Sequence, residues 1–255
     1  MNFLKRFYSY FTFGRQFFQG KHFLSTQESS LVEERKKPKR TDIINYLIQF
    51  LNRDICYLEI GVRDPNSNFS KILAKEKYSV DPGYEQEVNK ADFPFTSDDF
   101  FLKLQRGELL NPQIEFDVIF IDGLHLAEQV DRDIQNSLKH LKSDGFLILH
   151  DCNPPSEWHA RETYSHMLSP ALVKWNGTTW KAFFKWRQNK ELNSCCVDTD
   201  WGVGIFSKTH PIGKSLSENS NPFYEFDSLD KNRKEWLNLV SFDQLKTSLN
   251  LEREN

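Results

Sequence analysis

The sequence predicts an α/β fold built on a doubly wound, mostly parallel sheet. Two uninterrupted apolar runs of strand length, 118–121 and 146–149, are typical of parallel strands buried on both faces. A regular helical repeat lies between them. Strand signals and helical repeats alternate with short connections, which is the pattern of βαβ units in a doubly wound sheet.

The expected elements follow one another from residue 41. Thr41-Asp42 is a helix N-cap signal before apolar residues at helical spacing through Leu51. Strands are expected at 56–62, 78–81 and 93–95, with a short helix at 67–74 and a helix from an N-cap at Ser97 to Leu104. An amphipathic repeat predicts a helix from Leu126 to Leu141, ended by residues 143–145. Segments 195–198 and 202–206 predict a hairpin at one edge of the sheet.

The chain divides into three parts. Residues 1–40 form an aromatic and basic N-terminal arm with a charged linker, and residues 41–210 form the α/β domain. Residues 211–255 form a C-terminal extension with a helix that carries Trp236, Leu239, Val240 and Leu245. The 255 residues are enough for one large domain with appendages.

Composition excludes several classes of protein. The formal net charge of -3 gives no global field that would attract nucleic acid. The spacing of the four cysteines suits neither a metal site nor a disulfide framework, so we expect a reducing, cytoplasmic setting. The sequence contains no apolar run of the roughly 18 residues that a transmembrane helix needs.

The first 23 residues interleave aromatic side chains with Lys5, Arg6, Arg15 and Lys21. Their apolar residues look scattered around the helix rather than confined to one stripe. This distribution favours an arm that packs on the domain or on a second subunit of a homodimer. The alternative is a peripheral anchor, with aromatic rings in the membrane interface and cations on lipid headgroups.

Acidic residues at the ends of the first two strands predict a nucleotide site. The first strand ends in Glu59-Ile60-Gly61, where a glycine lets the backbone come close to a ligand. The second ends in Asp81, which can accept hydrogen bonds from both ribose hydroxyls. The alternative is that these are turn residues with no ligand. The loop after Gly61 lacks the G-x-G-x-x-G pattern, so a dinucleotide-type pyrophosphate site is not expected.

Four motifs in order carry a family resemblance. They are Leu58-Glu59-Ile60-Gly61-Val62, Val80-Asp81-Pro82, Asp117-Val118-Ile119-Phe120-Ile121-Asp122-Gly123-Leu124-His125, and Gly145-Phe146-Leu147-Ile148-Leu149-His150-Asp151. Across about residues 41–210 the chain resembles the class I S-adenosylmethionine-dependent methyltransferases, in particular the branch whose fourth strand ends in Asp-Gly-x-His. The resemblance implies a Rossmann-like sheet of about seven strands with an antiparallel last strand.

The resemblance also implies the cofactor contacts. Glu59, Gly61 and Asp122 would lie by the methionine moiety of S-adenosylmethionine or by the reacting centre, Asp81 by the ribose, and Thr96-Ser97 near the adenine. The chain departs from the family in the first loop, where Pro65 and Asn66 stand in place of a second glycine. Asn66 or Asn68 can supply the turn geometry, because asparagine tolerates a positive φ.

The ends of the two central strands predict the chemistry. Neighbouring parallel strands lie about 4.8 Å apart, so Asp122, His125, His150 and Asp151 should meet at one sheet edge. In one reading, Asp122 and Asp151 bind Mg²⁺, which holds and acidifies a diol. In the other, no metal is used, and His125 or His150 is the general base, oriented by an aspartate. A third, purely structural reading has Asp122 cap the next helix and His150 bond within the sheet edge.

A region dense in aromatic and basic residues, 174–187, follows these motifs. Trp180, Phe183, Phe184 and Arg187 share one helix face, which favours core packing, whereas Trp175 and Trp186 fall off that face and could line an acceptor cleft. Asp198 to Gly202 lies on the hairpin turn and could border the pocket.

These observations predict an enzyme that transfers a methyl group from S-adenosylmethionine to an oxygen of a sugar, glycan or other polyhydroxylated small molecule. Two alternatives stay open. One is a nicotinamide-dependent oxidoreductase on a similar sheet, and the other is a non-catalytic binding module that kept the fold.

Overall fold

A computed structural model of the chain describes residues 3–165, 169–217 and 221–253, so the first two residues of the arm lie outside it. The elements are α1 (Phe3–Gln19), α2 (Lys21–Arg35), α3 (Arg40–Leu51), β1 (Cys56–Ile60), η1 (Phe69–Lys71), β2 (Glu76–Val80), α4 (Ser97–Gln105), β3 (Phe116–Ile121), α5 (Ala127–Lys139), β4 (Leu141–Leu149), α6 (Thr179–Trp186), β5 (Asn193–Val197), β6 (Val203–Ser207), α7 (Phe226–Trp236), β7 (Leu239–Val240) and α8 (Phe242–Arg253).

The strands form one seven-stranded sheet in the order β2-β1-β3-β4-β6-β5-β7. Strands β2, β1, β3 and β4 are parallel to one another, and β6 is antiparallel to both of its neighbours, β4 and β5. This is the predicted doubly wound, Rossmann-like sheet with a reversed strand near its end.

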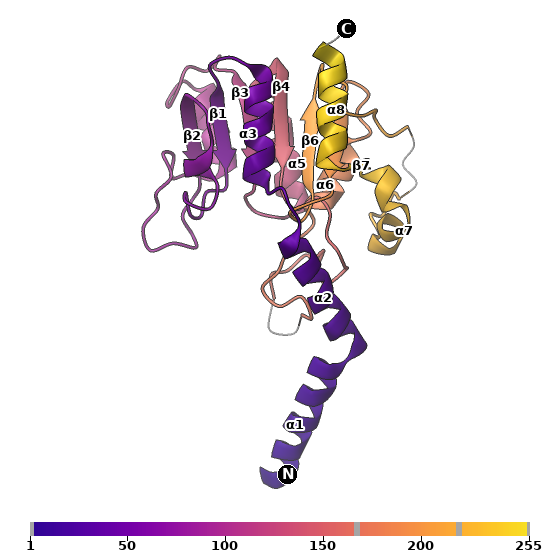
Figure 1. Ribbon diagram of the computed structural model, residues 1–255. Helices are drawn as coiled ribbons and strands as arrows, with labels where there is room; N and C mark the ends of the chain where they lie inside the picture. The colour runs from indigo at the N-terminus through magenta and orange to yellow at the C-terminus, as the bar shows by residue number, and fades with distance from the viewer. Residues whose placement is uncertain (1–2, 166–168, 218–220, 254–255) are drawn as a thin grey trace.

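Two apolar layers sandwich the sheet (Figure 1). Successive strand residues point to opposite faces, so in β3 Val118 and Phe120 pack under α3 and α8, whereas Ile119 and Ile121 pack under α4, α5 and α6. Because both faces are covered, the central strands carry the continuous apolar runs that predicted them. The functional groups therefore lie at the strand ends.

Several predicted boundaries were wrong. Thr41-Asp42 is not the cap of α3: the helix starts at Arg40 after Lys39, and Asp42 is the third helical residue, whose carboxylate accepts the Lys39 N–H at 2.9 Å. The expected strand at 93–95 is only a single bridge between Val80 and Phe93. The helix expected at 67–74 is a 3-10 turn. The N-cap of α4 is Thr96 rather than Ser97.

Two further expectations fail beyond residue 140. Residues 143–145 do not end α5, because α5 stops at Lys139 and these residues are already part of β4. The C-terminal extension has two helices rather than one, and between them Leu239 and Val240 form β7, which pairs in parallel with β5. Leu245 and Leu249 of α8 are fully buried, so the extension completes the sheet and the core.

The N-terminal arm consists of two helices that behave differently. Helix α2 packs against the domain, with Thr26, Ser30 and Glu33 buried. Helix α1 has no buried residue and projects away from the domain (Figure 1). The expectation that residues 1–23 pack on their own domain is therefore wrong for α1, and packing on a second subunit stays a prediction. None of the helices in the described part of the chain is long and apolar enough to span a bilayer.

Candidate active site

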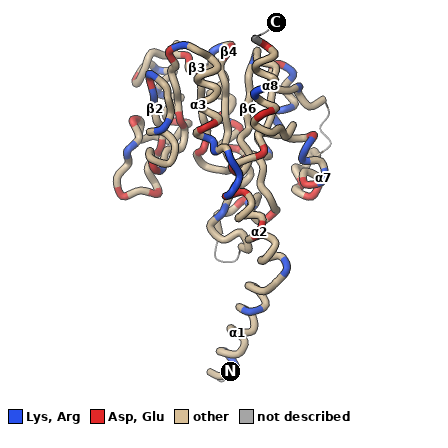
Figure 2. The backbone as a smooth tube through the Cα atoms, viewed as in Figure 1, with Lys and Arg blue, Asp and Glu red and all other residues tan. Residues whose placement is uncertain are grey.

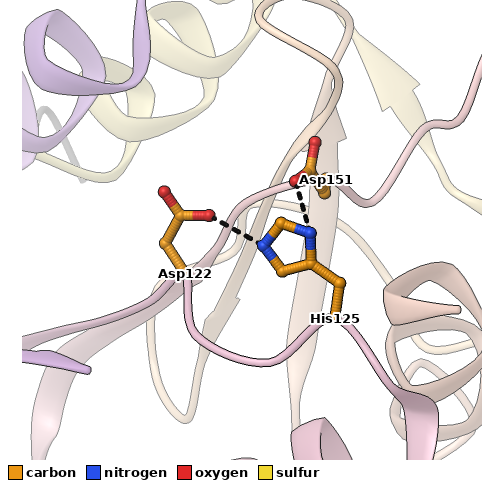
Figure 3. A group of neighbouring side chains, drawn as sticks. All are labelled: Asp122, His125 and Asp151. Carbon is orange, nitrogen blue, oxygen red and sulfur yellow. Dashed lines mark ion pairs between the residues drawn. The ribbon is translucent and has the colours of Figure 1, made fainter. Parts of the chain in front are cut away.

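The chain crosses the carboxyl edge of the sheet after β3 and again after β4, and four predicted side chains meet there. His125 bridges the two aspartates, with its Nε2 3.4 Å from Asp122 Oδ1 and its Nδ1 3.2 Å from Asp151 Oδ2 (Figure 3). His150 Nδ1 lies 3.2 Å from Asp122 Oδ1 and 3.4 Å from Asp151 Oδ2. Two imidazoles therefore share two carboxylates, as the strand ends predicted.

The two histidines differ in access and in bonding. The side chain of His125 is 20% exposed and that of His150 is 7% exposed. His125 Nδ1 donates to the Trp175 carbonyl at 3.0 Å, and Trp175 also lies against the His125 ring. The hydrogen bond on one ring nitrogen fixes the role of the other. Nδ1 is therefore occupied by Trp175 and Asp151, whereas Nε2 has Asp122 Oδ1 at 3.4 Å as its partner and is the nitrogen more open to a substrate.

Two further residues complete the site: Arg40, which sequence reasoning did not place in it, and Asp200, which it placed only in a turn that could border the pocket. Arg40, taken as part of a charged linker, has its guanidinium 3.4 Å from His150 Nε2 and 3.6 Å from Asp122 Oδ2. Asp200, on the hairpin turn, accepts from the Arg40 side chain at 3.3 Å and lies 3.5 Å from His150 Nε2. The turn at 198–202 thus borders the site, as expected.

Asn176 binds the second carboxylate oxygen of Asp151. Its side-chain amide donates to Asp151 Oδ1 at 2.8 Å, and both residues are buried. Gly177 follows it at φ +59, where a Cβ would lie 2.0 Å from the His125 carbonyl oxygen. The local sequence Asn-Gly therefore lets the loop after Trp175 press against the His125 loop. In the sequence, Asn176-Gly177 is only a turn signal, and it does not indicate that Asn176 contacts the site.

The charged side chains of the site shift one another's pKa values. Burial alone would raise the pKa of Asp122, but His150, His125 and Arg40 outweigh it and hold that pKa well below its ordinary value. Burial would lower the pKa of His125, but Asp151 and Asp122 raise it to about 9. The same two carboxylates raise the pKa of His150 well above its ordinary value. Without other ligands the cluster is a set of paired ions.

The same donor set suits a metal ion. One atom from each of Asp122, His125 and Asp151 lies within 4.8 Å of the others. Two carboxylate oxygens suit a hard divalent cation, and an imidazole nitrogen is accepted by most divalent transition metals. The residues therefore fit a divalent ion with open positions for an acceptor.

The expected cofactor residues line the ends of β1 and β2. Burial raises the pKa of Glu59 to about 7, and its Oε2 accepts from Tyr57 at 2.6 Å and from Asn68 at 3.0 Å. Asp81 follows β2, and its Oδ1 accepts the Gly83 N–H at 2.6 Å. Gly61 has φ +91, but the nearest neighbour of a Cβ there would be the Asp122 carbonyl oxygen, at 2.3 Å. Packing of the two loops therefore already requires this glycine, and its closeness to a ligand stays a prediction.

The expected adenine residues lie at the start of α4. The Thr96 hydroxyl accepts from the Asp99 N–H as the helix cap, and the buried Ser97 hydroxyl accepts from Gln129 at 3.0 Å. In the aromatic region 174–187, Trp180, Phe183 and Phe184 are buried in the core, as expected. Trp175 lies at the site, whereas Trp186 instead donates to Asp131 at 2.7 Å.

Comparison with known proteins bears on this geometry. Residues 59–152 match a family model described as a methyltransferase domain, and this stretch runs from Glu59 at the end of β1 to Cys152 just after Asp151. The matched stretch, which is less than half of the chain, identifies a methyltransferase domain in it. The nicotinamide alternative is therefore not retained. None of the curated proteins matches the sequence.

Solved structures show similarity at low identity. The O-methyltransferase of Bacillus cereus, solved with S-adenosylhomocysteine, is 13% identical over 72% of this chain and 90% of its own, with a TM-score of 0.41. TomG from Streptomyces achromogenes, an O-methyltransferase of tomaymycin synthesis solved with S-adenosylmethionine, is 10% identical over 82% of this chain and 100% of its own, with a TM-score of 0.44.

A third similar structure is MycE, a methyltransferase of the mycinamycin pathway solved with Mg and S-adenosylhomocysteine. It is 14% identical over 78% of this chain, with a TM-score of 0.41. The chain spans 61% of the length of MycE.

Proposed function

We propose that this methyltransferase acts on a hydroxyl oxygen of a sugar, glycan or other polyhydroxylated small molecule. The observation that carries the proposal is the accessible His125 imidazole held between two carboxylates at the end of the sheet. A hydroxyl must lose its proton as it is methylated, so an acceptor of this class needs such a group. Four free cysteines, three of them buried, support a reducing, cytoplasmic compartment as the place of the reaction.

On the cofactor side, we place the methionine end of S-adenosylmethionine beside Glu59 and Asp122, at the ends of β1 and β3. The ribose would lie beside Asp81 and the adenine beside Thr96 and Ser97. Support comes from the rule that ligands of open α/β sheets bind at the carboxyl ends of the strands. These residues lie at or just beyond those ends.

For the transfer itself, His125 would first lose the proton that Asp151 and Asp122 stabilise on it in the free site, and its Nε2 would then accept the hydroxyl proton while the oxygen displaces the sulfur of the cofactor. A C–O bond forms, the C–S bond breaks, and S-adenosylhomocysteine and the methyl ether are left. His150 is less exposed and bonded on both ring nitrogens, so we assign it the role of positioning Asp122. Alignment of acceptor and methyl group contributes further to the rate.

A second form of the same function follows from the metal-ligating geometry. Asp122, His125 and Asp151 would hold a divalent ion such as Mg²⁺, which when bound makes a coordinated hydroxyl more acidic. The two forms exclude each other at His125, because one nitrogen cannot both hold an ion and take up a proton. Chelation therefore distinguishes them.

The test uses S-adenosylmethionine with a labelled methyl group and a panel of sugars and glycans, with EDTA or with added Mg²⁺. We expect His125→Gln to lower turnover at least about 100-fold, the lower range for a lost general base, and His22→Gln, an exposed histidine on α2, to leave it unchanged. Turnover that survives EDTA supports the histidine form; loss with EDTA and recovery with Mg²⁺ supports the ion form. Full turnover by His125→Gln in EDTA would refute both.

A further inference from the structure

Helix α1 presents a continuous apolar stripe that the described part of the chain leaves uncovered except at its end, where Phe17 and Phe18 contact Phe23 of α2. The stripe consists of positions at spacings of three and four residues along one side of the helix: Phe3, Leu4, Phe7, Tyr10, Phe11, Gly14, Phe17 and Phe18. Phe3 is 78% exposed and Leu4 is 70% exposed. The uninterrupted helix therefore corrects the expectation that these residues are scattered around it, since only Tyr8 and Phe13 lie off the stripe.

All charged side chains of the arm up to residue 27 are cationic: on α1, Lys5 lies opposite the stripe, and Arg6 and Arg15 flank it. Lys5, Arg6, Arg15 and Lys21 are the charged residues of positions 1–27, and the first acidic residue is Glu28. Figure 2 shows the consequence: α1 carries blue segments and no red ones, whereas the domain carries both. The chain as a whole has a net charge of -3, so positive charge is concentrated on the arm.

The arm is held firmly where it meets the domain. Ser30 of α2 hydrogen-bonds to the buried His159 at 2.9 Å, and Gln27 donates to the Pro170 carbonyl at 2.6 Å. At the joint between the two helices, the Phe17, Phe18 and Phe23 rings lie 5.0 to 5.3 Å apart by their centroids. An exposed apolar helix is thus attached to a docked one.

We infer that α1 binds an anionic membrane surface. A helix with an aromatic and aliphatic stripe, and with lysine and arginine beside and behind it, lies in the interface plane of a bilayer. Each cation near an anionic leaflet strengthens the binding. A second copy of α1 fits less well, because two such helices would bring six cations together without the acidic partners that pair across coiled coils.

The root of the arm sets which side of the enzyme faces the membrane. Arg40, five residues beyond Arg35 at the end of α2, contacts His150 and Asp200 at the carboxyl edge of the sheet. In Figure 1 the arm extends from this same edge, opposite the C-terminus. A membrane bound by α1 would therefore lie on the active-site side of the domain, whatever the acceptor is.

The test is flotation of the full-length protein with phosphatidylcholine vesicles that contain or lack phosphatidylglycerol. We expect the protein to float with the anionic vesicles and less so at high salt. Lys5→Glu with Arg6→Glu should lower the partition coefficient at least about tenfold. Phe7→Ser with Phe11→Ser should lower it by a similar factor, because buried apolar area drives interfacial binding.

Matched controls lie on the domain. Lys90→Glu with Lys190→Glu makes the same charge change at exposed positions, and Tyr84→Ser with Phe223→Ser removes two rings that are each 84% exposed. Both controls should float like the unmodified protein. Equal losses in the controls, or no flotation of the unmodified protein, would overturn the inference. A lipid-free dimer in sedimentation that Phe7→Ser with Phe11→Ser abolishes, with no flotation, would instead identify a second copy as the partner.

Discussion

Arg40 shows how a single residue can connect the arm, the helix layer and the site. It is the first residue of α3, its N–H donates to Asp200 at 3.0 Å, and its guanidinium lies within 3.6 Å of Asp122. Burial would lower its pKa, but Asp122, Asp200 and Asp151 raise it. Three carboxylates at one sheet edge would repel one another without this cation, so Arg40 lets them coexist near His150.

Asp81 carries the prediction at the residue scale. Replacing Asp81 by Ala removes the acceptor proposed for the ribose hydroxyls, and we expect the Kd for S-adenosylmethionine to rise at least about tenfold by calorimetry. Asp81→Asn is the control for the turn, since its side-chain oxygen can still accept the Gly83 N–H that Asp81 Oδ1 accepts. An unchanged Kd for Asp81→Ala would remove the ribose assignment.

The meeting of the four strand-end residues could be predicted because all of them lie within four residues of the end of β3 or β4. Asp122, His125, His150 and Asp151 come together through the parallel pairing of β3 with β4. Arg40 and Asn176 could not be found this way. Their side chains reach the site from segments far away in sequence, and nothing local marks them.

The predicted boundaries of helices and strands were wrong where contacts with residues distant in sequence outweighed local propensity. Ser143-Asp144-Gly145 has turn-forming composition, yet it lies inside β4, where the backbone register with β3 shifts between Phe116 and Val118. The buried Asp117 at this shift accepts from Arg53 at 2.7 Å and from Lys142 at 2.9 Å. These ion pairs fix the strand but depend on residues up to 64 positions away.

The contact between α2 and the domain gives a prediction at the element scale. His159 bonds Ser30 through Nε2 and Ser156 through Nδ1, and burial lowers its pKa from 6.5 to about 4. The unfolded chain takes up this proton near pH 6.5 and the folded chain only near pH 4. Stability is therefore full above pH 6.5 and falls as the pH drops through this window, by on the order of 2–3 kcal/mol.

His159→Gln tests this, because glutamine retains a donor and an acceptor but does not titrate. Urea unfolding at pH 7 and at pH 4.5 should show a smaller pH-dependent loss for this variant than for the unmodified protein. Parallel losses in the two proteins would mean that His159 does not cause the acid sensitivity.

At the scale of the whole molecule, ordered motifs predicted more than local patterns did. The four strand-end motifs indicated the doubly wound sheet and its reversed strand, and both are present. The last strand of the sheet, β7, has two residues, and its pairing with β5 depends on how residues 211–255 return to the core. The direction in which α1 projects could not be predicted from the sequence either, because it depends on how α2 docks on the domain.

The residues proposed for the cofactor and for the acceptor lie at one edge of the sheet, so we expect cofactor binding to stabilise the whole fold. S-adenosylhomocysteine at a hundred times its Kd should add about 2.7 kcal/mol to the free energy of unfolding. For a chain of this size, Tm should then rise by roughly 5–10 °C. NADH at the same concentration should leave Tm unchanged, because the loop after β1 lacks the glycine pattern of dinucleotide sites. Equal shifts with both ligands would show that the edge does not discriminate them, and no shift with S-adenosylhomocysteine would place the proposed cofactor residues outside any binding site.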